Sequence, residues 1–489
     1  MTKSRNLYFF LIAIGLLFFL LIRYKYQFSA LESDTGIYAY GAQEILRGNL
    51  PYKSFHVNKP PGILIIYAAA FKLLGESSYN IKLTATFSVL LSSLFVYLIA
   101  KKLLGFKYAV LSFVIFLFSL SLPFIQGIDA NTEIFMITPL LFGLWLLYVD
   151  RSKKTLFISG FFLGISVLIK QTAIANFIAT LVWFLFFKRD SFIKYFLIYT
   201  LGFLTPILSL VGYLLQLGIW QEFWFSNYVL NKAYISPQSL GLRWLIFPLN
   251  AVSENLTLWF YGLIGILTSS FLLIRNKSRK SNYLYLITLN FIMSLVFIQL
   301  TGRGYQHYYI QLVPFLSIFS IYGIKNAFNK WNKYFISSSL IFFLFISLFY
   351  LCKAVIFVEA KSLIETTRNN QRGKWFDQSI YVAEYINKFT DPGDIIYNLG
   401  RESQIYFYTK TRSPSRFIND IVFPYFPETL KETCDDLSHN KPKLIVNTLR
   451  PPRFPEKWAQ YVWNEIKKCG NLEIDRKEEV YFAEVWFLK

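Results

Sequence analysis

The residues best suited to chemistry follow the first apolar run of the sequence. Glu32 and Asp34 stand one residue apart, just before a short helical segment from about 35 to 47. Ser33 or Asp34 can cap this helix, and Gly48 can end it. A negative charge is favoured near the positive end of a helix, and a carboxylate held there can act as a general base. The sequence leaves both roles open for Asp34: base or simple helix cap.

A second reactive group is Lys59, which directly precedes Pro60, Pro61 and Gly62. Proline is excluded from the interior of a helix but can begin one, so this turn holds Lys59 at the start of the apolar stretch 62–74. A lysine in that place can bind a lipid phosphate as a point charge. Ordinary extension of its ammonium group toward lipid headgroups is the alternative.

Three further groups of polar residues lie beside apolar runs. They are Asp129, Asn131 and Glu133, then Lys170, then Arg303 and His307. Each group alone is a weak signal, because a single histidine beside a membrane is more often a hydrogen-bonded structural residue than a catalyst. Together they supply carboxylates and cations on one side of the bilayer, which suits an anionic lipid-linked substrate.

The elements that must position these residues are membrane helices. The chain has 489 residues, of which 54% are hydrophobic and 16% charged, against about 25% charged in soluble proteins. This composition excludes a cytosolic enzyme, a disordered protein and a disulfide scaffold. The net charge of +21 does not indicate nucleic-acid binding, because residues 358–489 hold 20 Lys+Arg against 19 Asp+Glu. The basic excess therefore lies among the apolar runs, as is usual for cytoplasmic loops.

Eleven apolar runs approach the ~20 residues needed to cross a bilayer. They fall at about 7–23, 81–100, 107–126, 133–149, 155–169, 173–187, 192–215, 255–274, 283–301, 309–324 and 334–357. The stretch 62–74 is too short to cross and suits a re-entrant or interfacial helix. If it does not cross and the N-terminus is cytoplasmic, the inside loops carry 18 basic residues and the short outside loops four. The positive-inside rule favours this arrangement, with the first run as an uncleaved anchor.

The sequence thus predicts an α-helical polytopic membrane protein with about eleven transmembrane helices and a small extracytoplasmic α/β domain. We expect a transmembrane domain over 1–357, with an external first loop at 24–80, and the α/β domain over 358–489. In the α/β domain we predict three strands, at 394–398, 443–447 and 481–488. We predict helices at 380–389 and 458–468. Cys434 and Cys469 have no metal-ligand spacing but could form a disulfide in an oxidising exterior.

These features resemble the GT-C membrane glycosyltransferases, and among them the protein mannosyltransferase-like and lipid A aminoarabinose transferase-like families. The resemblance rests on an aspartate after the first span, a tyrosine-rich short helix, Gly-Asn-Leu-Pro-Tyr ending at Tyr52, and Lys-Pro-Pro-Gly beginning at Lys59. The glycine-bearing span that ends at Lys170 and the His-Tyr pair at His307 add to it. The similarity covers roughly residues 1–325.

The resemblance implies that a sugar is transferred from a polyprenyl-phosphate carrier to an acceptor hydroxyl, with inversion at the anomeric carbon. Asp34 would be the general base. Four cations would hold the donor phosphate as it leaves: Lys59, Lys170, Arg303 and His307. Six residues would orient acceptor or donor: Glu32, Tyr38, Tyr52, Asp129, Asn131 and Glu133.

The spacing of Glu32 and Asp34 departs from the adjacent acids of many mannosyltransferases and could favour Mg or Mn. Polyprenyl-phosphate donors lack the pyrophosphate that most needs a metal, so we expect no obligatory metal. The expected partners are the lipid-linked donor, membrane lipids, and an acceptor that is a lipid, a glycan or a protein. A bacterial inner membrane is the expected location. The sequence does not identify the sugar that is transferred.

Other functions remain as alternatives. A transporter or flippase of lipid-linked glycans would place polar groups or helix breaks at the bilayer midplane, and the Thr205-Pro206 pair is the best such signal. A glycan polymerase or ligase would carry a large external loop between two late spans. A simple anchor for the C-terminal domain would need only one span.

Overall fold

The structure is a computed structural model. It describes residues 2–121, 125–187, 189–235, 259, 262–267, 279–302, 305–330, 372–449, 455–469 and 472–489. The chain divides into two compact units. One contains residues 1–27, 82–212 and 235–363, and the other contains 28–81, 213–234 and 364–489. The first loop, assigned from sequence to the transmembrane domain, thus belongs to the same compact unit as the C-terminal residues.

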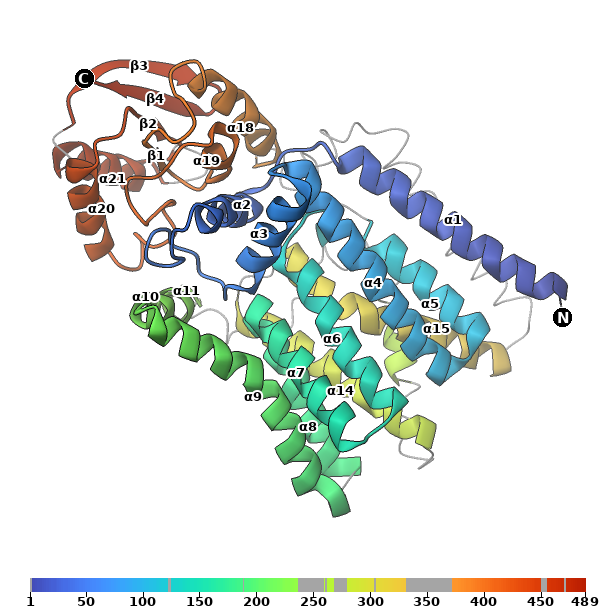
Figure 1. The fold of residues 1–489 in the computed structure, drawn as a ribbon. Helices are drawn as coiled ribbons and strands as arrows, with labels where there is room; N and C mark the ends of the chain where they lie inside the picture. Colours follow the sequence, from blue (N-terminus) through green and yellow to red (C-terminus); the bar gives the residue numbers. More distant parts are fainter. Residues whose placement is uncertain are drawn as a thin grey trace. The chain divides into compact units, whose positions relative to one another are not determined.

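The first unit is helical. Its helices are α1 (Thr2–Tyr26), α4 (Ser78–Leu104), α5 (Phe106–Ser119), α6 (Thr132–Val149), α7 (Lys153–Ile169), α8 (Ile174–Phe187), α9 (Phe192–Gln216), α14 (Arg279–Leu300) and α15 (Val313–Lys330), with 3-10 turns at Gln171–Ala173, Arg189–Ser191 and Gln306–Leu312. Helix α6 packs along α7, α8 along α14, and α5 along both α1 and α15 (Figure 1).

Five described helices are long and apolar enough to cross a membrane: Asn6–Tyr26, Ser78–Leu104, Thr132–Val149, Phe192–Gln216 and Asn282–Leu300. The chain is therefore a multi-pass membrane protein, but the predicted number of eleven spans is not confirmed. Two apolar helices predicted as spans, α5 and α8, are shorter than the others. The predicted span 334–357 lies outside the described residues, as does most of 255–274.

Helices α7 and α9 approach each other closely because glycines line their contact. A Cβ atom at Gly160 would lie 2.1 Å from the carbonyl oxygen of Tyr199, and one at Gly202 would lie 2.1 Å from that of Phe157. Small residues permit such approach between membrane helices. Helix α9 continues through Pro206, so the break considered as a transporter signal is absent.

The second unit combines short helices with a sheet. Its elements are α2 (Ser33–Leu46), α3 (Gly62–Leu74), α10 (Trp220–Trp224), the π turn η4 (Phe225–Val229), α11 (Leu230–Tyr234), α18 (Arg372–Ile386), α19 (Gln404–Thr409), α20 (Glu428–His439), α21 (Glu456–Cys469), β1 (Ile396–Leu399), β2 (Leu444–Asn447), β3 (Ile474–Val480) and β4 (Ala483–Leu488). The strand order is β1-β2-β4-β3, with β1 parallel to β2 and the other pairs antiparallel. The predicted small C-terminal sheet with flanking helices is therefore present, while its place outside the membrane stays a prediction.

The C-terminal elements pack directly on the first loop (Figure 1). The rings of Tyr40 on α2 and Tyr406 on α19 lie 4.9 Å apart, and the Tyr40 hydroxyl accepts a 3.0 Å hydrogen bond from the Ser413 backbone. Cys434 on α20 is disulfide-bonded. The side chain of Cys469 lies outside the described part, so the predicted pairing of the two stays a prediction.

Candidate functional site

Asp34 lies inside the first turn of α2, rather than just before the helix as the sequence predicts, and its side chain is half-buried. Neither Ser33 nor Asp34 caps the helix: the N-cap residue is Glu32, whose side chain makes no capping hydrogen bond. Within the described part of the chain, the Asp34 carboxylate makes no hydrogen bond or ion pair. A carboxylate at a helix N-terminus with no partner among the described residues is available to a substrate, and Asp34 does not cap the helix in this structure.

The start of α2 is held by α19. A Cβ atom at Gly36 would lie 2.6 Å from the backbone nitrogen of Gln404, so only glycine permits this approach. Glu32 is buried, and its carbonyl oxygen accepts hydrogen bonds from the Gly36 backbone at 2.7 Å and from the Thr35 hydroxyl at 3.0 Å. The turn that carries Asp34 is therefore fixed by its own backbone and by the C-terminal residues.

Lys59 precedes α3, whose N-cap residue is Pro61, as the proline pair predicts. The Lys59 ammonium donates a 3.2 Å hydrogen bond to Oδ1 of Asn58 and is half-buried. The Asn58 carbonyl in turn accepts a 3.2 Å bond from Nδ2 of Asn231 on α11. The turn thus presents a cation that is bonded to a neutral amide, so its charge remains available to an anion.

Two buried tyrosines, Tyr38 and Tyr52, hold the elements that carry Asp34 and Lys59. Tyr52 is fully buried with φ of 68°, and its hydroxyl donates a 2.9 Å hydrogen bond to the Lys59 carbonyl. Burial holds the pKa of Tyr52 well above its ordinary value, so the hydroxyl stays a donor. Tyr38 is buried on α2 with its ring 5.9 Å from that of Tyr67 on α3. Both are positioning residues for α2, α3 and the lysine turn.

His56 is buried in the same turn, between the rings of Phe225 and Phe417 at 6.4 and 5.8 Å. Burial, with the nearby charges of Arg416 and Lys59, lowers its pKa from 6.5 to about 3. The imidazole is therefore neutral, and its Nε2 atom has no hydrogen-bond partner among the described residues.

We expect this histidine to make the protein less stable in acid. The unfolded chain binds a proton near pH 6.5 and the folded chain only near pH 3, so stability falls as the pH drops between these values. The loss between pH 6.5 and 5 is about 2 kcal/mol. Thermal unfolding at both pH values should show a smaller loss in His56→Asn, while the exposed-histidine variant His439→Gln should behave as wild type. Equal slopes in all three proteins would contradict this origin.

The first unit brings together another set of predicted residues around Glu133. Its carboxylate forms a buried ion pair with Lys170, and Oε2 accepts a 2.8 Å hydrogen bond from the Thr132 hydroxyl. Nε2 of His307 lies 3.9 Å from Oε1 of Glu133. The Lys170 ammonium also lies 3.9 Å from the ring centroid of Tyr308. Lys170 is therefore neutralised by Glu133 in this structure, which makes it a less open phosphate ligand than Lys59.

The remaining predicted residues of this unit lie near the start of α6. Asn131 is its N-cap residue, and Nδ2 of Asn131 is buried without a hydrogen-bond partner among the described residues. Asp129 is buried and attracted electrostatically to Arg23. The Arg23 guanidinium donates hydrogen bonds of 3.2 and 3.1 Å to the carbonyls of Ile128 and Leu120. Asp129 and Arg23 thus fix the segment that leads into Asn131.

The structure therefore gathers the predicted residues into two sets. Glu32, Asp34, Tyr38, Tyr52 and Lys59 belong to the second unit. The first unit holds Asp129, Asn131, Glu133, Lys170 and His307, while Arg303 lies outside the described residues. The described residues include no group of three or more His, Cys, Asp or Glu side chains suited to a metal. The predicted independence from a metal stays a prediction.

The helical organisation is shared with solved membrane proteins. The chain superimposes on ArnT from Cupriavidus metallidurans bound to undecaprenyl phosphate, with a TM-score of 0.65 and 13% identity. The superposition covers 99% of this chain and 98% of the ArnT chain. It also superimposes on the oligosaccharyltransferase AglB from Archaeoglobus fulgidus in complex with an inhibitory peptide and a dolichol-phosphate, with a TM-score of 0.56 and 11% identity, covering 99% of this chain and 74% of that one.

At the level of sequence, residues 58–213 match the family model described as dolichyl-phosphate-mannose-protein mannosyltransferase. No curated protein matches the chain. The family match begins at Asn58, directly before Lys59, and extends through the glycine-bearing helix to Lys170 and beyond. The resemblance to the protein mannosyltransferases drawn from the sequence motifs is therefore confirmed over residues 58–213, and the solved structures share the fold.

Proposed function

We propose that this chain, whose fold is that of the GT-C membrane glycosyltransferases, moves a sugar from a polyprenyl-phosphate donor to an acceptor hydroxyl at the outer face of the membrane. The observation that carries the proposal is the Asp34 carboxylate, half-exposed in the first turn of α2 and without a partner among the described residues. The solved proteins that share the fold include one bound to undecaprenyl phosphate and one bound to a dolichol-phosphate, which supports a lipid-phosphate donor.

In the proposed reaction Asp34 accepts the proton of the acceptor hydroxyl while the oxygen attacks the anomeric carbon. The bond between that carbon and the phosphate oxygen breaks, and the configuration inverts. Negative charge builds up on the departing phosphate, and Lys59 stabilises it more strongly in the transition state than in the bound donor. His307, Lys170 and Arg303 remain further candidates for the phosphate, with Lys170 already paired to Glu133.

The proposal is tested with the purified protein in nanodiscs and a panel of polyprenyl-phosphate hexoses and pentoses. Release of free polyprenyl phosphate that requires an acceptor would support transfer and would identify the donor. An excess of EDTA should leave the rate unchanged if no metal is obligatory. The absence of release with every donor, combined with movement of a lipid-linked glycan across a vesicle bilayer, would favour the transporter alternative.

We expect Lys59→Ala to weaken binding of polyprenyl phosphate and to slow transfer together. A charge-assisted hydrogen bond contributes about 1.5–3 kcal/mol, so the dissociation constant should rise at least about tenfold. Equilibrium binding of polyprenyl phosphate to nanodisc-held protein measures this change. Lys72→Ala, a basic residue in the last turn of α3, is the matched control and should bind as wild type. Unchanged affinity in Lys59→Ala would remove this lysine from the phosphate site.

A further inference from the structure

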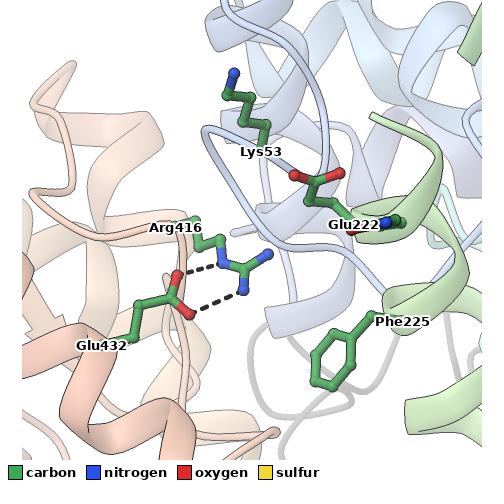
Figure 2. Close-up of a pocket in the computed structure, with 6 residues that line it drawn as sticks. Lys53, Glu222, Phe225, Arg416 and Glu432 are labelled. Atoms are coloured by element: carbon green, nitrogen blue, oxygen red, sulfur yellow. Dashed lines mark hydrogen bonds and ion pairs between the residues drawn. The ribbon is translucent and has the colours of Figure 1, made fainter. Parts of the chain in front are cut away.

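A polar pocket lies in the second unit. Its volume is about 430 Å³, within the ~300–1,000 Å³ range of small-molecule sites. Three segments far apart in sequence build it (Figure 2). The lining residues are Lys53 from the first loop, Gln221, Glu222 and Phe225 from α10 and η4, and Arg416 and Glu432 from the C-terminal part.

One wall of the pocket is rigid. Arg416 donates two hydrogen bonds to Glu432, from Nε at 2.6 Å and from Nη2 at 2.9 Å. Its guanidinium lies 4.7 Å from the ring centroid of Phe417, and its carbonyl accepts a 2.7 Å hydrogen bond from the His56 backbone. A planar bidentate pair held in this way has a fixed geometry, so its outer edges can select a ligand by shape.

The opposite wall holds a carboxylate that the protein leaves unsatisfied. Oε2 of Glu222 is buried and has no hydrogen-bond partner among the described residues. Buried polar atoms are nearly always hydrogen-bonded, so this oxygen has an unused capacity to accept a hydrogen bond at the pocket wall. The exposed Lys53 lines the same pocket, and Figure 2 shows its ammonium pointing away from Arg416 while the Glu222 carboxylate lies on the Arg416 side.

The formal charges of the lining residues cancel, because two of them are cations and two are carboxylates. A phosphate would meet Glu222 and Glu432, whereas a neutral ligand with several hydroxyl groups could donate to the carboxylates and accept from the cations. The Phe225 ring supplies the apolar surface, and it is the first residue of a π turn, a distortion that often marks functional sites. Paired donors and acceptors beside an aromatic ring suit the polar edge and C–H face of a sugar.

The same segment connects the pocket to the proposed donor site. Phe223, next to Glu222, has its ring 5.2 Å from that of Tyr52, and Tyr52 donates its hydroxyl hydrogen to the Lys59 carbonyl. Asn231, at the other end of the segment, binds the carbonyl before Lys59. A ligand in the pocket would therefore lie against the elements that hold the Lys59 turn.

We propose that this pocket is a saccharide subsite that holds a neutral sugar unit of the acceptor. The identification of the ligand as acceptor rests on the proposed function, whereas the binding of a neutral saccharide does not. The acceptor would then be a glycan or a glycolipid whose sugar residue is anchored by Glu222 and Arg416 beside Phe225.

The test is saturation-transfer-difference NMR on the full chain in nanodiscs, with the methyl glycosides of glucose, galactose and mannose as probes. At least one glycoside should receive magnetisation on its ring protons. Glu222→Gln should weaken its binding by about tenfold, as expected for loss of a charge-assisted hydrogen bond. Glu428→Gln, at an exposed acid of α20 outside the pocket, is the matched control and should bind as wild type.

Three results would overturn the proposal: no glycoside bound by wild type, equal binding by Glu222→Gln, or binding of inorganic phosphate with no glycoside. Release of polyprenyl phosphate, measured on the same samples, tests the proposed sugar transfer independently of the saccharide subsite. Release without glycoside binding overturns the saccharide subsite alone. Glycoside binding without release from any donor keeps the sugar site and overturns transfer, together with the acceptor role.

Discussion

Asp34→Asn is expected to lower the turnover number for sugar transfer by about 10²–10⁴-fold, the usual contribution of a general base. The amide keeps the size of the side chain but cannot accept the proton of the acceptor hydroxyl at neutral pH. Binding of polyprenyl phosphate should be unchanged, because Asp34 acts on the acceptor rather than on the phosphate. Release of free polyprenyl phosphate, followed under saturating donor, measures the effect.

The structure makes this experiment interpretable. Because Asp34 has no partner among the described residues, its replacement removes no interior hydrogen bond and should leave the unfolding temperature near that of wild type. Asp475→Asn, at an exposed acid of β3 in the same unit, is the matched control and should turn over normally. Turnover by Asp34→Asn within threefold of wild type would exclude Asp34 as the base. A loss of expression would instead assign it a structural role.

Local chemistry made some elements predictable. Helix α3 spans Gly62–Leu74, as predicted, because a proline pair begins it and Gly75 ends it with φ of 95°. The helix α2 was predicted to begin two residues late, since Ser33 and Asp34 resemble capping residues but lie inside the first turn. Strand β3 was missed because it lies at the edge of the sheet, where charged residues replace the alternation of a buried strand.

Helices α19 and α20 were also missed, for different reasons. Helix α19 is only 6 residues long and buried, so it shows no amphipathic pattern. Helix α20 buries Leu430, Cys434 and Leu437, whose helical spacing is present in the sequence but interrupted by a polar majority. Predicted strands at 394–398, 443–447 and 481–488 all appear, since buried apolar runs between turn residues define them.

The candidate site was predictable where one segment carries it and not where several segments meet. Asp34 and Lys59 stand out because the first loop concentrates unusual residues beside a membrane. Arg416 and Glu432 had no such signal, because their role arises only when the C-terminal residues fold onto α10. Likewise, only the structure places Glu222 on this pocket with an unsatisfied oxygen.

Lys170→Met is expected to be strongly destabilising, because it leaves the buried Glu133 carboxylate without its ion-pair partner. Removal of one member of a buried pair commonly costs about 3–5 kcal/mol. Here Lys170 is 6% exposed and Glu133 1%, and the lysine also loses its contact with the Tyr308 ring. The unfolding temperature of the protein in nanodiscs should fall by several degrees, as the loss of a few kcal/mol predicts.

The double variant Glu133→Gln with Lys170→Met separates stability from catalysis. It removes both charges, so most of the lost stability should return, because no unpaired charge remains in the interior. If Lys170 only balances Glu133, binding of polyprenyl phosphate should return with stability. If Lys170 also contacts the donor phosphate, the double variant should fold well and yet bind polyprenyl phosphate more weakly than wild type. If the double variant is no more stable than Lys170→Met, Lys170 does not stabilise this unit by pairing with the Glu133 charge.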